Sequence, residues 1–189
     1  LQTLFHQIVD SLDDNNLEGL KKTILEGQVA GYFRQTHFDY SEGPFTPFTK
    51  NLPDSKITLL TSSGHFQEGQ DPEPFGIKNM TQKDAESRIF DFLKEKPGLS
   101  EIPFSLSPDN LKVRHGGYDI RGSKKDPNVS FPYQRLPELV KKGRLGSLTD
   151  TAYSFVGACS QKRLLKSVLP EWVELFQKTG ADAALLIPV

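Results

Sequence analysis

Cysteine is scarce in this sequence, because its 189 residues contain a single one, Cys159. One thiol excludes an internal disulfide and any metal cage built from several cysteines. A chain that relies on no disulfide is typical of a reducing compartment, so we expect the protein in the cytoplasm.

An excess of one charge and a long apolar run are also missing. Lys and Arg total 23 against 24 for Asp and Glu, which leaves no basic surplus to neutralise the phosphates of a nucleic acid. No run approaches the roughly 20 apolar residues that a membrane-spanning helix needs. We therefore expect neither a nucleic acid nor a membrane as partner, although 36% hydrophobic residues are enough to form a core.

Short apolar runs alternate with segments of helical spacing. The runs that predict strands are 56–61, 111–114, 145–148 and 183–187, and the segments that predict helices are 81–93, 132–142 and 160–180. Such alternation is typical of βαβ units. The sequence therefore predicts an α/β fold with a mainly parallel sheet flanked by helices, and it places Leu186 of the last run in the core.

The first part of the chain has a different pattern. Residues 1–12 and 17–25 have the apolar spacing of helices, and residues 32–51 are rich in Phe and Pro without a regular period. We predict N-terminal helices and a Phe/Pro-rich arm over 1–52, and the α/β domain over 53–189, in one folding unit. The aromatic residues of the arm are typical of an interface.

Two polar loops, 62–75 and 115–126, each follow a predicted strand. Ligands of open α/β sheets bind at the carboxyl ends of strands. His65 and His115 are therefore candidate acids or bases near neutral pH, with Asp119 orienting the ring of His115. The alternative is that each histidine is a hydrogen-bonded structural group.

The glycine pair in the second loop has two interpretations as well. Gly116 and Gly117 allow backbone N–H groups to approach a small anion, with Arg114, Arg121 or Lys124 contacting a carboxylate. A solvated turn needs the same glycines. A metal site built from the two histidines with Asp119 and Asp126 matches no known ligand spacing, and we predict no metal.

Cys159 directly precedes a predicted helix, whose N-terminus favours a thiolate. Its apolar neighbours, Phe155, Val156 and Ala158, favour instead a buried, inert thiol.

Several motifs carry a resemblance in the same order along the chain. They are HGGYD at 115–119, KDPNVSFP at 125–132 with Arg135-Leu136 and Glu138-Leu139, YSFVGA at 153–158, TGADAALLIP at 179–188, and, upstream, TLLTSSGH at 58–65. Over roughly residues 56–189 the chain resembles the selenoprotein B family of glycine, betaine, sarcosine and D-proline reductases.

The resemblance implies an activity. In that family the last strand leads into a selenocysteine or cysteine, with a further cysteine three residues on, and these groups cleave a C–N bond of a small amino-acid-like substrate reductively. The resemblance implies no other cofactor, a thiol electron donor or partner reductase subunit, and possible homo-oligomers. Here the redox residue is expected beyond Val189, and its role is not transferred to Cys159.

The resemblance also assigns residues to a pocket at the strand ends. It supports His115, Asp119, Asp126, His65 and Tyr153 as pocket residues. Together with the loop patterns, we predict His115 and Asp119 as catalytic residues, and as substrate-binding residues His65, Gly116, Gly117, Tyr118, Asp126 and Tyr153. The alternative function is a non-catalytic binding or assembly module that retains this pocket and docks a partner through the N-terminal segment.

Overall fold

A computed structural model describes residues 46–189 of the chain. The helices predicted over 1–12 and 17–25, and most of the Phe/Pro-rich arm, lie outside the described residues. The chain divides into a first unit, Leu1–Phe48, and a second unit, Thr49–Val189. The strands and helices of the described residues all belong to the second unit.

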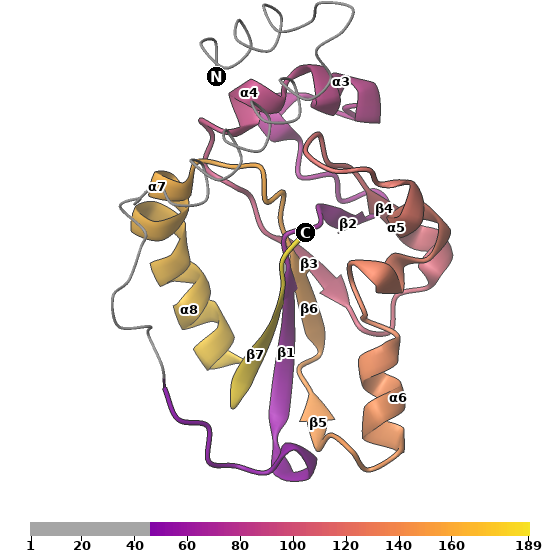
Figure 1. Ribbon diagram of the computed structural model, residues 1–189, viewed down its shortest axis with the longest axis vertical. Helices are drawn as coiled ribbons and strands as arrows, with labels where there is room; N and C mark the ends of the chain where they lie inside the picture. Colours follow the sequence, from indigo (N-terminus) through magenta and orange to yellow (C-terminus); the bar gives the residue numbers. More distant parts are fainter. Residues whose placement is uncertain (1–45) are drawn as a thin grey trace, which may run out of the picture. The chain divides into compact units, whose positions relative to one another are not determined.

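The second unit is built on a mostly parallel sheet centred on β1 (Lys56–Thr61) (Figure 1). On one side β1 pairs in parallel with β7 (Ala183–Ile187), and on the other with β5 (Ser147–Leu148) and β6 (Thr151–Ser154). The outer strand, β3 (Ser100–Pro103), is antiparallel to β6. The predicted fold class is therefore confirmed, with one antiparallel strand in the sheet.

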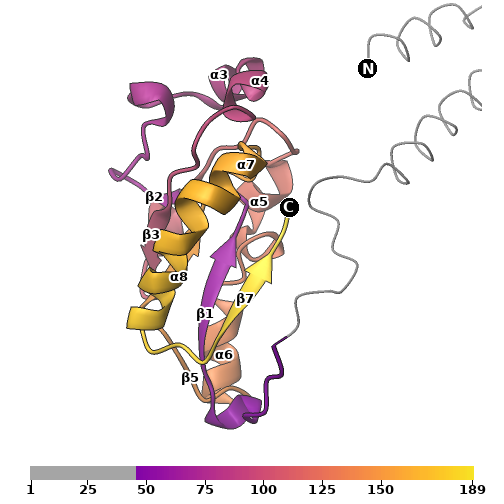
Figure 2. The same cartoon turned by 90° about the vertical axis from the view of Figure 1, so that its left-hand side faces the viewer.

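Helices cover both faces of this sheet because its central strand is apolar on both sides. Leu59 packs with Phe131 and Leu136 on the face of α6 (Arg135–Lys141), while Leu60 packs with Trp172 on the face of α8 (Leu169–Lys178). Figure 2 shows α8 in front of the strands and α6 behind them. The core is thus formed by two apolar layers, one on each side of β1.

The remaining helices are short. They are α3 (Gln82–Ser87), α4 (Ile89–Phe92), α5 (Arg121–Lys125), α7 (Gln161–Arg163) and a π-helical segment, Leu164–Val168, between α7 and α8. Thr81 caps α3 as predicted, because its side chain accepts from the backbone N–H of Asp84 in a capping box. Ser160 likewise caps α7, and the helix restarts as α8 next to Pro170.

One predicted strand of the main sheet belongs elsewhere. β4 (Leu111–Val113) pairs antiparallel with β2 (His65–Gln67) in a separate two-stranded ladder. Gly64, at φ 75°, turns the chain out of β1 into β2. The prediction of 111–114 as a strand is confirmed, but its place among the parallel core strands is wrong.

Besides β2, which lies inside the predicted loop 62–75, three further elements were not expected. β3 carries a proline and a single buried side chain, Ile102, so its sequence has no strand pattern. β6 ends with the first two residues of the YSFVGA motif, and it was not recognised because the polar residues Thr151 and Ser154 interrupt the apolar pattern of a strand that is buried over most of its length. α5 lies inside the predicted loop 115–126. Its buried residues are Ser123 and Ile120, which directly precedes the helix.

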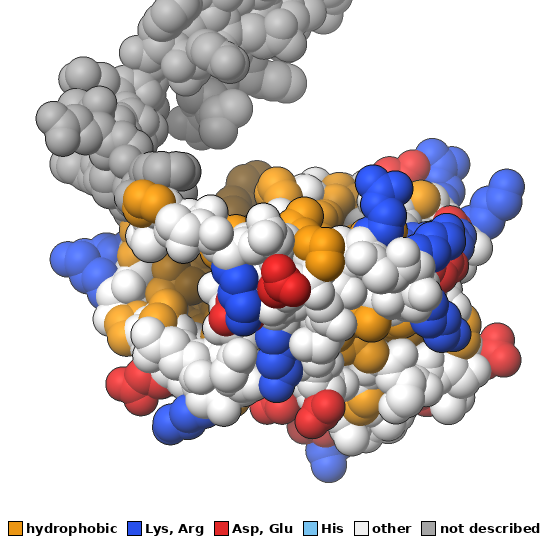
Figure 3. Space-filling view, turned by 90° about the horizontal axis from the view of Figure 1, so that it is seen from below, with side chains coloured by type: hydrophobic (Ala, Val, Ile, Leu, Met, Phe, Trp, Pro, Cys, Tyr) orange, Lys and Arg blue, Asp and Glu red, His pale blue; other side chains and the backbone are white. Residues whose placement is uncertain are grey.

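The sequence predicted that Leu186 is a core residue, and this prediction is wrong, because Leu186 is 62% exposed. The reason is that, among the described residues, β7 pairs with β1 alone and forms an edge of the sheet. Elsewhere on the surface, basic and acidic side chains are interspersed on the face shown in Figure 3. No helix within residues 46–189 combines the length and hydropathy needed to cross a membrane.

Candidate functional site

Three parallel strands end at one place, around Ser62. Its backbone N–H donates to the Ile187 carbonyl at 3.1 Å, and its hydroxyl accepts from the Val189 N–H at 3.0 Å. Its carbonyl accepts from the Gly157 N–H, beyond the end of β6, at 2.9 Å. We call the group Ser62, Gly157, Ala158, Val189 and His115 the strand tip.

His115 joins the strand tip through Ala158. Its ring is buried, Nδ1 accepts from the Gly117 N–H at 2.9 Å, and the Ala158 N–H points at Nε2 from 3.4 Å. A neutral imidazole has one acceptor nitrogen, and the shorter contact identifies it as Nδ1. The ring proton then lies on Nε2, so that Nε2–H and the Ala158 N–H point at each other and neither has an acceptor in this contact.

The charge state of His115 follows from its burial. Removal from water lowers the pKa of the imidazole from 6.5 to about 4. The ring is therefore neutral near pH 7, where it donates a hydrogen bond but carries no positive charge. A role as a charged acid at neutral pH would need a much higher pKa.

The backbone around His115 is held by a residue that the sequence did not reveal as functional, Gln82 of α3. The Gln82 amide oxygen accepts from the His115 N–H at 3.0 Å, and its NH₂ group donates to the His115 carbonyl at 2.7 Å. Gly116 then fits against the carbonyl oxygen of Ala85, where a Cβ atom would overlap it. No spacing in the sequence links positions 82 and 115, so only the fold reveals the two hydrogen bonds between Gln82 and the His115 backbone.

Gly116→Ala should destabilise the protein by about 1 to 3 kcal/mol, because a backbone carbonyl cannot move aside as a flexible side chain can. The matched control is Gly122→Ala in α5, where the added methyl meets only Val129 Cγ2 at 3.9 Å. That control should be neutral or slightly stabilising. Urea unfolding of both variants measures the difference, and equal midpoints would contradict the close packing.

Tyr118 and Asp119 follow the glycine pair, and their side chains contact different partners. The Tyr118 hydroxyl donates to the Ser63 carbonyl at 3.1 Å, and its ring lies 4.7 Å from that of His115. The exposed carboxylate of Asp119 accepts from Arg121 at 2.6 and 2.9 Å, and this bond lowers the Asp119 pKa to about 2. The structure thus brings Tyr118 to His115, whereas Asp119 engages Arg121 and the His115 ring is oriented by Gly117.

Asp126 and Tyr153 are engaged within the fold. The Asp126 carboxylate caps the turn Pro127–Val129 and accepts from the backbone and side-chain nitrogens of Asn128 at 3.0 and 2.9 Å. Tyr153 is buried in β6, and its ring packs 4.7 Å from that of Phe176 on α8. Both contacts are structural, and neither brings the side chain to the strand tip.

His65 lies beside the strand tip rather than in it. The residue is 1% exposed, and its Nδ1 lies 2.6 Å from the Ser63 hydroxyl. Its backbone N–H donates to the Ser154 hydroxyl, and its ring stacks on Phe131 at 5.3 Å. Nε2 is buried without a partner among the described residues. Burial lowers the pKa of this histidine to about 4.

Acidification should destabilise the protein through His65. Its pKa is about 4 in the folded protein and has the ordinary value of 6.5 in the unfolded chain, so between these pH values the unfolded chain binds a proton that the folded chain does not. The stabilisation is complete above pH 6.5 and falls as the pH drops towards 4. Between pH 7 and 4 the wild type should lose about 3 kcal/mol more than His65→Gln. Urea unfolding at both pH values checks this, and parallel losses would count against it.

The remaining candidates give no redox or metal centre. Cys159 is half-buried, and desolvation raises its pKa, in agreement with an inert thiol rather than a thiolate. Within residues 46–189, no three or more side chains of His, Cys, Asp and Glu are grouped so that they could hold a metal ion.

Comparison with known proteins gives one family. The family model of "Glycine/sarcosine/betaine reductase selenoprotein B (GRDB)" matches residues 42–188. No solved structure matches the chain significantly.

Three curated proteins are similar to the chain. D-proline reductase subunit gamma of Acetoanaerobium sticklandii is 29% identical over 75% of this chain and 52% of its own length. Glycine reductase complex component B subunit gamma of Symbiobacterium thermophilum is 26% identical over 76% of this chain and 30% of its own. Sarcosine reductase complex component B subunit beta of Peptoclostridium acidaminophilum is 24% identical over 76% and 30%. The chain thus spans about half or less of the length of these relatives.

Proposed function

Because the chain belongs to the glycine/sarcosine/betaine reductase selenoprotein B family, we propose that it is part of a subunit of a reductase complex. The three relatives are named as subunits of D-proline, glycine and sarcosine reductases, which supports this proposal. The proposed reaction is the thiol- or selenol-dependent reductive cleavage of a C–N bond in a small amino-acid-like substrate.

The proposed reaction needs two electrons and two protons. The C–N bond breaks, the carbon and the leaving nitrogen each gain a hydrogen, and the redox residue and its neighbouring thiol end joined by an S–S or Se–S bond. An external thiol or a partner subunit reduces that bond again. No described residue supplies the redox pair, so the proposal places it after Val189.

The strand tip is the observation that carries the proposal. Val189 is held by the Ser62 hydroxyl, and its continuation starts where the Gly157–Ala158 turn meets His115. A thiolate or selenolate is an anionic acceptor, and Nε2–H of His115 and the Ala158 N–H, which point at each other, have no acceptor in that contact. We propose that they lower the pKa of the redox group and so activate it.

Some of the other predicted site residues support His115, and the roles of the rest stay predictions. Gly116, Gly117 and Tyr118 support His115 by their close fit and hydrogen bonds. The catalytic role of Asp119 and the substrate-binding roles of Asp126 and Tyr153 stay predictions, as do the cytoplasmic location and the homo-oligomer.

A second candidate function is a non-catalytic assembly module. The observation that favours it is the apolar edge of the sheet, where Leu185, Leu186 and Val189 are exposed. A partner strand pairing with β7 would cover these side chains. In that case Leu186→Lys would abolish binding to partner subunits in size-exclusion chromatography, whereas binding at the wild-type level would reject this function.

The reductase proposal is tested on a chain extended through the expected redox motif and combined with its partner subunits. Dithiothreitol-dependent C–N cleavage is measured as release of the amine from glycine, sarcosine and betaine, and as opening of the ring to a linear amino acid for D-proline. We expect cleavage of at least one of them and none after the redox residue is replaced by serine. Cleavage that is absent for all four, or unchanged by the serine variant, rejects the proposal.

A further inference from the structure

The backbone of His115 bonds to a side chain, whereas the residues before it bond to a neighbouring strand. The ladder between β4 and β2 reaches Val113, and the Arg114 N–H donates to the Gly64 carbonyl at 3.1 Å. At His115 the backbone N–H and carbonyl both bond to the side-chain amide of Gln82, at 3.0 and 2.7 Å. The amide thus takes the place of a peptide group of a neighbouring strand, and one side chain holds the backbone of His115.

The Gln82 amide has one orientation that satisfies its partners. Its NH₂ group donates to the His115 carbonyl and, at 2.9 Å, to the carboxylate of Glu86, one turn further along α3. Both of these partners accept, whereas the His115 N–H donates, so the amide oxygen must face that N–H. Gln82 is also the first residue of α3, directly after the capping residue Thr81. The amide is therefore fixed from its own helix as well as from the loop.

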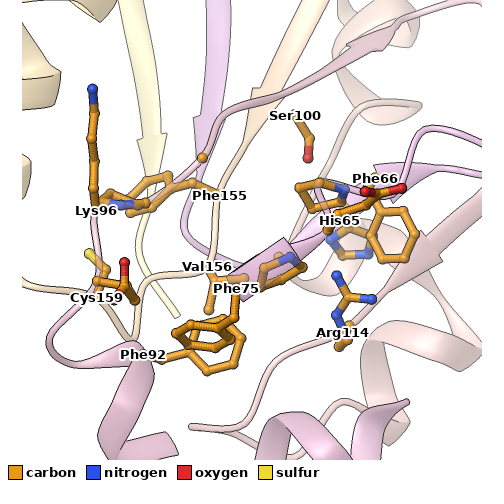
Figure 4. Close-up of a pocket in the computed structure, with 17 residues that line it drawn as sticks. His65, Phe66, Phe75, Phe92, Lys96, Ser100, Arg114, Phe155, Val156 and Cys159 are labelled. Carbon is orange, nitrogen blue, oxygen red and sulfur yellow. The ribbon is translucent and has the colours of Figure 1, made fainter. Parts of the chain in front are cut away.

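The residues on both sides of His115 are anchored separately from the amide. Arg114 donates to the Met80 carbonyl at 2.9 Å, and Figure 4 shows Arg114 close to His65 in the wall of a pocket. Gly116 fits against a backbone carbonyl of α3. Removal of the amide therefore frees the backbone of His115, while these two contacts keep the loop beside α3.

The ring of His115 follows its own backbone, because only two rotatable bonds join them. Nδ1 accepts from the Gly117 N–H, and Nε2 faces the Ala158 N–H of the strand tip from 3.4 Å. The fit around the ring is close, since a Cβ atom on Gly117 would lie 2.9 Å from the ring atom Cε1. A turn of the backbone at His115 therefore moves Nε2 away from the strand tip.

We propose that Gln82 is a positioning residue, whose amide holds the backbone of His115 so that Nε2–H of the ring is presented to the redox group at the strand tip. Gln82 touches neither the substrate nor the redox group in the proposed site and acts through His115. The effect on the reaction rests on the proposed function, whereas the orientation of the ring does not.

The first test is made on the full chain and needs no reduction. Gln82→Ala removes the amide, and Gln82→Met removes it but keeps the length of the side chain; both new residues are good helix formers. Lys83→Ala is the matched control, because Lys83 is the exposed next residue of α3. NMR titration of the imidazole nitrogens reports the proton position and the pKa of His115. Among the four histidines of the chain, its signals are those lost in His115→Ala.

We expect His115 of the wild type to keep its proton on Nε2 and to stay neutral down to about pH 4. In both Gln82 variants the two tautomers should mix, and the pKa should rise by about one unit or more towards 6.5, because a freed ring regains contact with water. Lys83→Ala should match the wild type. An unchanged tautomer and pKa in both Gln82 variants overturns the proposal. Thermal melts verify that the variants fold, and the Met variant decides the test if the Ala variant unfolds.

The second test is a double-mutant cycle in the extended chain with its partner subunits. Gln82→Ala should lower kcat about 10- to 100-fold and leave KM within about twofold, the effect of a misplaced catalytic group. Gln82→Ala combined with His115→Ala should be no slower than His115→Ala alone, because no ring is left to position. A merely structural glutamine would lower the rate by the same factor with and without His115. That result overturns the proposal.

Failure of the proposed function looks different. A complex that cleaves none of the tested amino acids rejects the reductase reaction, and the NMR titration alone then decides whether Gln82 orients the ring. A ring that changes in the Gln82 variants while kcat stays at the wild-type level rejects the positioning role but keeps the reaction.

Discussion

His115→Ala should lower the rate of thiol-dependent reduction about 10²- to 10³-fold, in the extended chain with its partner subunits. This is the usual effect of removing one donor that faces a developing or resident negative charge in a site shielded from water. Nε2–H of His115 and the Ala158 N–H are such donors, and the former is lost with the ring. The mutation should lower kcat rather than raise KM, because the ring contacts the redox group and not the substrate in the proposed site.

The pKa of the redox residue separates this role from a structural one. The thiolate or selenolate absorbance, titrated against pH, should shift to higher pH in His115→Ala and return part of the way in His115→Asn, whose amide is also a donor. Asp119→Asn is the matched comparison, since that exposed carboxylate engages Arg121. A slower His115→Ala enzyme with an unshifted titration would contradict activation by this histidine.

Phe131→Ala should destabilise the protein by about 3 to 5 kcal/mol, the largest stability effect that we expect from a single substitution. Phe131 is fully buried, and its ring is stacked between His65 at 5.3 Å and Tyr133 at 5.2 Å. It also belongs to the apolar layer that includes Leu59 of β1. Truncation leaves a cavity that the surrounding rings cannot fill.

Val129→Ala is the control for Phe131→Ala, because Val129 lies two residues away and is 65% exposed. Surface truncations of this kind usually change stability by less than about 0.5 kcal/mol. Both are compared by urea unfolding monitored by circular dichroism. A loss below about 1 kcal/mol for Phe131→Ala would mean that this apolar layer is not tightly packed.

The parts of the fold that the sequence predicted well are those with strong local signals. β1 and β7 were expected over the ranges that they occupy, because each consists mainly of aliphatic or β-branched residues. The caps of α3 and α7 were also expected, since Thr81 and Ser160 supply the side-chain acceptor that a helix start requires.

The parts that were missed depend on partners far away in the sequence. β3 is a strand because β6 lies beside it, and nothing in its own four residues indicates this. Leu186 is exposed because β7 forms an edge, and an edge strand and a central strand can have the same apolar sequence. In both cases the pairing of strands in the folded sheet determines the outcome, and the local sequence pattern does not indicate it.

The candidate site also contains residues that the sequence indicated and residues that only the fold reveals. His115 was predicted from its place after a strand and from a motif, and in the structure its ring lies 3.4 Å from the Ala158 N–H, next to the Gly157 that binds Ser62 at the end of β1. The expected partnership of Asp119 with His115 was not found, because Arg121 lies two residues away and offers a stronger, two-point contact. Gln82 was missed because its role depends on how α3 packs against the loop.

The most direct test of the central claim is a crystal structure of the extended, reduced protein, in which one distance is measured. That distance joins Nε2 of His115 to the sulfur or selenium atom of the first redox residue after Val189. The account predicts a separation of about 3.5 to 4 Å, within hydrogen-bond reach of a large anion. A separation beyond about 6 Å, too long even for a single bridging water, would contradict it.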